Sequence, residues 1–200
     1  MEFIRMSIVY PHLIACCVAI GLVFTSDVEM VRQLLTGAPE APQDQSHLPD
    51  LQRTVAWALV ALWVSGIAII SLDAWSQGLA YFRNPKLQAK VAIVVLLTLN
   101  GCLLHKAVLP ALQRAGSLLH LPLGSRMLAV FAGVVSGVSW FYAAMLGIGR
   151  PLNWKYSLVE ILGAFPVLVA GGFAAMLALA AWAKARNRDS GQPFQDVPAY

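Results

Sequence analysis

The stretch VAWALVALWVSGIAIISL, residues 55–72, decides the fold class, because it carries no charged side chain over a length close to that of a membrane span. A helix needs roughly 20 consecutive apolar residues to cross the hydrocarbon layer of a bilayer. Comparable apolar runs lie on both sides of this stretch, and charged or Pro- and Gly-containing turns separate them. The pattern predicts five membrane-spanning helices, over residues 4–36, 51–75, 86–112, 126–148 and 156–183.

The composition agrees with this prediction. Hydrophobic residues make up 58% of the chain and charged residues 12%, whereas charged residues make up roughly 25% of an average soluble domain. We therefore expect an all-α polytopic membrane protein, a five-helix transmembrane bundle built as a four-helix core plus one helix. A single bundle should occupy residues 1–185, and residues 186–200 should form a polar tail.

The net charge of +4 does not indicate nucleic acid as a partner, because Lys and Arg lie between apolar blocks and form no basic stripe with exposed aromatics. The lipid bilayer is the expected partner, with a homo-oligomer or a larger membrane complex around the chain. Five spans place the N-terminus on one face, called face A, and the C-terminus on the other, face B. The basic cluster of the tail favours a cytoplasmic face B in a bacterial inner membrane.

Ionisable side chains inside a span are costly, so their depth indicates where function could reside. His12 and Lys90 lie near the face A ends of the first and third predicted helices, which run in the same direction. Asp27 and His105 follow them by the same number of residues, fifteen, or about 22 Å of helix. The two helices should each present polar groups at both edges of the membrane.

This spacing limits where a metal could bind. His12 and His105 should lie near opposite membrane faces, so they cannot ligate the same iron. His105 could instead meet His47 or His120 at face B. Face A also gathers Asp73 and Glu160, which we interpret either as interfacial side chains or as secondary site candidates.

Several stretches resemble the copper-resistance-D and HemJ-type family of small membrane proteins. The resemblance covers roughly residues 8–150 and rests on residues 12–35, which contain GLVF and Asp27, on Val64-Ser65-Gly66, on the NPKLQAKVA stretch at 84–92, and on Asn100-Gly101. Members of the family have a four-helix core with a histidine early in helix one and a lysine opening helix three. The resemblance implies that His12 is the axial ligand of haem b and that Lys90 is its functional, catalytic neighbour. The fifth helix has no counterpart in that core.

Three functions follow as hypotheses. The first is a haem-b-binding membrane redox protein that either transfers electrons or, as in the HemJ-type members, oxidises a porphyrinogen; an oxidoreductase activity would belong to this hypothesis. The second is a non-catalytic membrane subunit of a larger respiratory, photosynthetic or transport complex. The third is a copper or small-solute permease, which five spans without an inverted repeat make less favoured.

Overall fold

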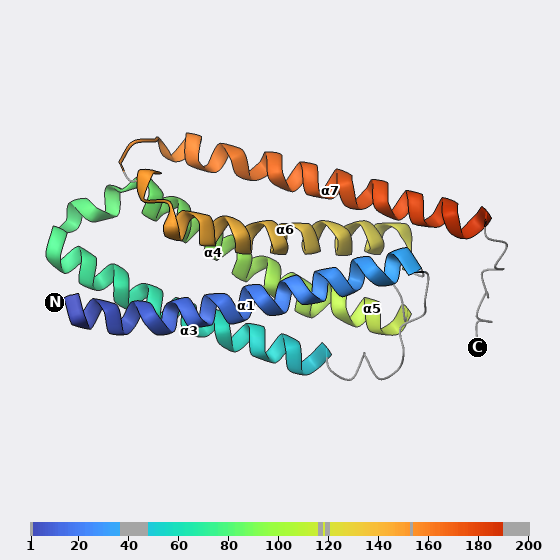
Figure 1. The fold of residues 1–200 in the computed structure, drawn as a ribbon, viewed down its shortest axis with the longest axis horizontal. Coiled ribbons are helices and arrows are strands. Elements are labelled where there is room, and N and C mark those ends of the chain that lie inside the picture. The colour runs from blue at the N-terminus through green and yellow to red at the C-terminus, as the bar shows by residue number, and fades with distance from the viewer. Residues whose placement is uncertain (1, 37–47, 116–117, 119–120, 153, 190–200) are drawn as a thin grey trace.

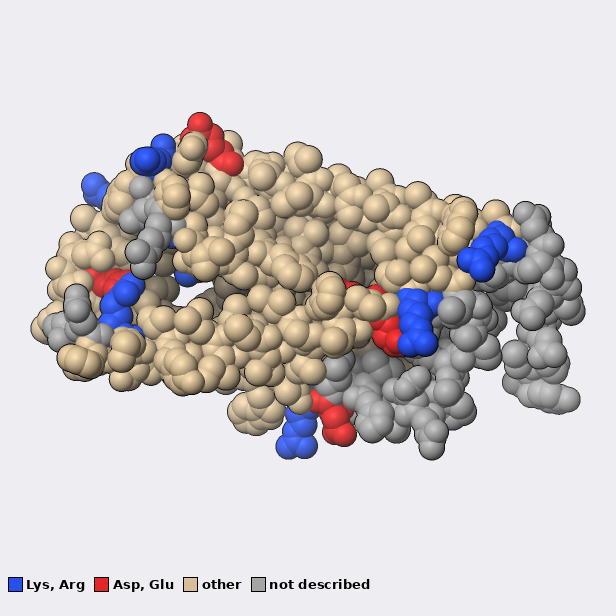
Figure 2. Space-filling model, viewed as in Figure 1, with Lys and Arg blue, Asp and Glu red and all other residues tan. Residues whose placement is uncertain are grey.

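The computed structural model describes all residues except 1, 37–47, 116–117, 119–120, 153 and 190–200. Its described residues are helical and contain no strand, and five helices are long and apolar enough to cross a membrane. The fold is therefore the predicted five-helix transmembrane bundle, in which the first residues of α1 and the last residues of α7 lie at opposite ends (Figure 1). Charged side chains gather toward these ends on the face shown in Figure 2, with an uncharged belt between them.

The helices follow the predicted ranges closely and extend them at several ends. They are α1 (Glu2–Thr36), α3 (Leu48–Gln77), α4 (Pro85–Leu103), which continues through the π-helical turn η2 (Leu104–Val108) into α5 (Leu109–Ala115), α6 (Leu123–Ile148) and α7 (Leu158–Asp189), with the short 3-10 turns η1 (Leu79–Arg83) and η4 (Arg150–Leu152). Helix α7 continues to Asp189, six residues beyond the predicted end of the fifth span, and residues 190–200 of the expected tail lie outside the described residues.

Local sequence explains several helix ends. Gly78 follows α3 with a φ of 76°, a left-handed conformation that glycine adopts without strain. The Asn84 side chain accepts a 3.0 Å hydrogen bond from the backbone N–H of Lys86, and Pro85 occupies the first helical position of α4. The π-helical turn η2 stands immediately before Pro110, which lacks the N–H that a regular helix would use.

The bundle consists of two packed groups. Helix α1 packs along α3, while α4 packs against α6 and α7. Toward the middle of the molecule a buried apolar cluster joins the two groups, consisting of Ala19, Ala58, Leu97 and Trp140 from α1, α3, α4 and α6. Nearer face A, the cluster of Ala89, Ile93, Tyr142, Leu146 and Ile161 joins only α4, α6 and α7.

The cluster toward the middle contains side chains of both groups of helices, whereas the cluster nearer face A contains side chains of one group. The two groups are therefore less closely packed near face A. Figure 2 shows the molecule hollowed between the α1–α3 pair and the group containing α4 and α6, at the end where the N-terminus lies. Figure 1, in the same view, shows the two groups converging toward the middle of the bundle. The hollow is the part of the fold that positions the candidate site.

Candidate functional site

His12 points from α1 toward α3, where its Nδ1 lies 2.7 Å from the hydroxyl oxygen of Ser65. The same hydroxyl oxygen lies 2.5 Å from the carbonyl oxygen of Ala61, one turn earlier in α3. Two oxygens approach this closely only with a proton between them, and the serine hydroxyl has a single proton. Ser65 therefore donates to Ala61 and accepts from His12, which places the imidazole proton on Nδ1.

This arrangement leaves the other ring nitrogen, Nε2, with its lone pair available. A neutral imidazole carries one donor nitrogen and one acceptor nitrogen, and a hydrogen bond that fixes the donor also fixes the acceptor. In metal proteins the ligating histidine typically donates its second nitrogen in this way, which orients the ring. His12 is thus held by its neighbour in the tautomer that ligates through Nε2.

Gly66 provides space beside the His12 ring. A Cβ at this position would stand 3.8 Å from the Cε1 atom of His12, so any larger side chain on Gly66 would extend toward the imidazole. Because glycine has no side chain, the ring faces backbone there. Ser65 and Gly66 together form the surface of α3 that receives His12.

Lys90 approaches the same site from the second group of helices. It lies in the second turn of α4, is largely shielded from solvent, and is close enough to His12 for their charges to interact. It also interacts electrostatically with Cys16, one turn along α1 from His12, and with Asp73. The structure therefore brings Lys90 of α4 near His12 of α1.

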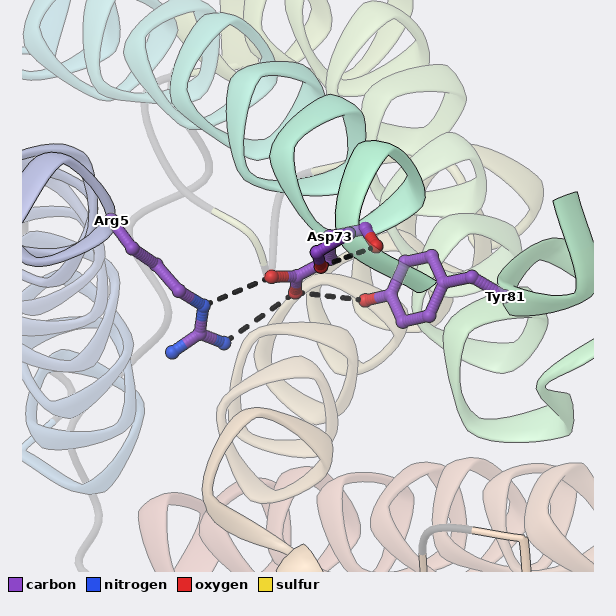
Figure 3. Close-up of polar contacts among 4 residues, drawn as sticks. Arg5, Asp73 and Tyr81 are labelled. Atoms are coloured by element: carbon purple, nitrogen blue, oxygen red, sulfur yellow. Dashed lines mark hydrogen bonds and ion pairs between the residues drawn. The ribbon is translucent and has the colours of Figure 1, made fainter. Parts of the chain in front are cut away.

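A second group of polar side chains lies closer to the face A end of the bundle than His12 does (Figure 3). Arg5 of α1 reaches Asp73 of α3 through Nε at 3.0 Å and Nη2 at 3.4 Å, and the phenol of Tyr81 in η1 donates to Asp73 at 3.2 Å. Burial, reinforced by the Asp73 carboxylate, raises the pKa of Tyr81 to about 12. The three side chains, here called the face A latch, tie α1, α3 and η1 together.

The remaining candidates are not part of this site. Glu160 forms a capping box at the start of α7: its carboxylate accepts from the Ser157 backbone N–H at 2.7 Å, while the Ser157 hydroxyl accepts from the Glu160 N–H at 3.3 Å. Glu160 therefore caps the N-terminal end of α7. Asp27 lies against α6, in the interface between the two groups of helices.

His105 is exposed and lies in η2, beyond the cluster that closes the hollow, so the structure does not bring it to His12. His47 and His120, its expected neighbours, lie outside the described residues. Within the described part of the chain no group of three or more His, Cys, Asp or Glu side chains could hold a metal ion.

Sequence reasoning did not assign roles to Ser65, Gly66, Arg5 or Tyr81. The only available signal was the Ser-Gly pair within an otherwise apolar helix, since small and hydroxyl-bearing residues mark close helix approaches. Their partners depend on the register between α1 and α3, which an apolar sequence does not specify.

Comparisons of this chain with protein-family models, with curated proteins and with solved structures found no match. The candidate site therefore rests on its own geometry.

Proposed function

We propose that this chain is a haem-b-binding integral membrane redox protein in which Nε2 of His12 is an axial ligand of the haem iron. The observation that carries the proposal is the His12–Ser65–Ala61 hydrogen-bond chain, which leaves Nε2 as an oriented acceptor in the span. A haem site needs such an imidazole, held by a second hydrogen bond, within a helix-walled pocket.

The donor set fits a haem better than a bare metal ion. An isolated ion generally requires three or four protein ligands, and the described residues offer no such group. A haem brings four of its own nitrogens and requires only one or two axial ligands. A single histidine with an oriented Nε2, as His12 has, suits this requirement.

The residues around His12 would have distinct roles. Ser65 would fix the tautomer and the ring orientation, and Gly66 would keep the side of the ring clear. Lys90 would supply a positive charge from α4, in the other group of helices, where it could hold or move a proton. Bound haem would supply one-electron redox chemistry.

Orientation and assembly belong to the same proposal. We place face B in the cytoplasm of a bacterial cell, because α7 ends there with Arg186, which stacks over Trp182 at 5.6 Å from the ring centroid. The chain would act in the inner membrane as a homo-oligomer or within a larger complex.

The absorption spectrum of the purified protein tests the proposal. The chain should be expressed with a haem precursor, purified in mild detergent and assayed by pyridine haemochrome. We expect a Soret band, a reduced α band typical of haem b and a defined haem stoichiometry. A colourless protein that also fails to take up added haemin would contradict the proposal and favour a non-catalytic membrane subunit.

A further inference from the structure

Asp27 is an acidic side chain in the interface between α1 and α6, and it does not belong to the His12 site. Its Oδ2 lies 3.2 Å from the position that a Cβ would occupy on Gly137. The carboxyl thus occupies a notch that exists because residue 137 has no side chain. Substituting a larger residue there would displace either the carboxyl or the helix.

The notch lies at membrane depth. Gly137 stands 14 residues from Leu123 and 11 residues from Ile148, the two ends of α6, which corresponds to roughly 21 Å and 17 Å of helix. One turn before Asp27, Phe24 packs edge-to-face on Phe141, with ring centroids 6.4 Å apart. Asp27 therefore faces the middle of α6, one turn along α1 from an aromatic contact between the two helices.

Among the described residues, no ion pair joins the Asp27 carboxyl to a charged side chain. On its own helix, Glu29 and Arg32 form an ion pair with each other at 3.6 Å. The elements packed against α1 are α3, α6 and α7. Their charged side chains within the described residues lie near helix ends: Asp50, Arg53 and Asp73 on α3, Arg126 on α6, and Glu160 and Arg186 on α7. Three of them also contact other residues, namely Asp73, Glu160 and Arg186.

An ionised carboxyl at this depth without a partner is costly, and such residues usually have a functional role. A metal cation would need several further oxygen ligands, and within the described residues no group of three or more His, Cys, Asp or Glu side chains gathers at Asp27. A proton needs only the carboxyl itself. We propose that Asp27 is an intramembrane proton-binding site, which takes up and releases a proton in the α1–α6 interface.

This site is separate from the proposed haem site. Along the inner face of α1, Ala19 lies between His12 and Asp27 within the buried apolar cluster that closes the hollow. Its other buried members are Ala58, Leu97 and Trp140, and none of these side chains ionises. The proposal for Asp27 therefore stands whether or not haem binds at His12.

A hydrophobic carbodiimide tests the proposal in the full-length protein. The reagent partitions into lipid and reacts with a carboxyl that supplies its proton, so it selects protonated acids in apolar surroundings. Glu29 is a matched control, because it lies on the same helix two residues away but is ion-paired with Arg32. Modification at each residue is measured by mass spectrometry of the digested protein.

We expect modification at Asp27 and not at Glu29. The modified fraction at Asp27 should fall as the pH rises from about 5 to about 9, by roughly tenfold per unit once the proton dissociates. Asp27→Asn should abolish the modification. Labelling at Glu29 with Asp27 unmodified would overturn the proposal, as would labelling at Asp27 that does not vary with pH. Protection by sodium ions would also overturn it, because it would identify a cation site.

Discussion

The hydroxyl of Ser65 connects His12 to the backbone of α3: it accepts from Nδ1 of the imidazole at 2.7 Å and donates to the Ala61 carbonyl at 2.5 Å. This relationship fixes which ring nitrogen of His12 can bind a metal, and it does so through a residue that touches no ligand itself.

Replacing Ser65 with Ala removes the acceptor for the Nδ1 proton and releases the ring. Loss of a second hydrogen bond of this kind typically weakens metal binding by roughly 10- to 100-fold. We expect haem affinity of the Ser65→Ala variant to fall by a factor in this range, measured by titration of the apoprotein with haemin. Ser71→Ala changes an exposed serine of the same helix and should leave the affinity unchanged. Equal affinity of the two variants would show that Ser65 does not orient a ligand.

The space beside the His12 ring can be filled in steps. A Cβ on Gly66 would stand 3.8 Å from the imidazole, an ordinary contact, so Gly66→Ala should retain haem. Gly66→Phe should occupy the space that the ring faces and abolish the Soret band. Gly21→Phe is the control, because a Cβ on Gly21 meets nothing within 4 Å. Circular dichroism should show unchanged helicity in all three variants. Full haem content in Gly66→Phe would show that haem does not occupy the space beside the His12 ring.

The face A latch should be sensitive to alkaline pH. Since the pKa of Tyr81 is raised to about 12 in the folded protein, above an unfolded value near 10, its contribution to stability is complete below about pH 10. That contribution is lost as the pH rises toward about 12, because the unfolded state releases the proton first. The difference in melting temperature between the wild type and Tyr81→Phe should therefore shrink over this range. A difference that stays constant would mean that the phenol has no raised pKa.

Helices α6 and α7 pack closely at Gly172. A Cβ there would lie 2.9 Å from Cγ1 of Val134, a separation at which either the Val134 side chain or the helices must shift. Gly172→Ala should lower stability by about 1–3 kcal/mol through overpacking, read as a lower melting temperature in detergent. Gly171→Ala meets nothing within 4 Å and should be neutral or slightly stabilising. Adding Val134→Ala to Gly172→Ala should restore stability. If stability is not restored, the contact with Val134 is not the cause of the loss.

The fold could be predicted from the sequence because length and polarity of an apolar run suffice to identify a membrane-spanning helix. The proximity of His12 and Lys90 agrees with a count of residues along two helices that run in the same direction. Glu160 could have been assigned from sequence as well, because Ser157 and Glu160 have the spacing of a capping box.

The contacts of the site could not be predicted in the same way. Helices that are apolar on every side carry no periodic pattern to show which face meets which neighbour. The pairing of Arg5 with Asp73 and of His12 with Ser65 depends on the axial register between α1 and α3. That register is fixed by packing and by the hydrogen bonds themselves, so it became visible only in three dimensions.

The haem spectrum of two histidine variants tests the central claim most directly. His12 carries the oriented Nε2, whereas His105 is exposed in η2 beyond the apolar cluster. Both variants should be purified alongside the wild type and compared by the Soret absorbance per chain and by pyridine haemochrome. We predict that His12→Ala loses the haem spectrum and that His105→Ala retains it. Haem retained by His12→Ala and lost by His105→Ala would contradict the assignment of the axial ligand and the proposed site with it.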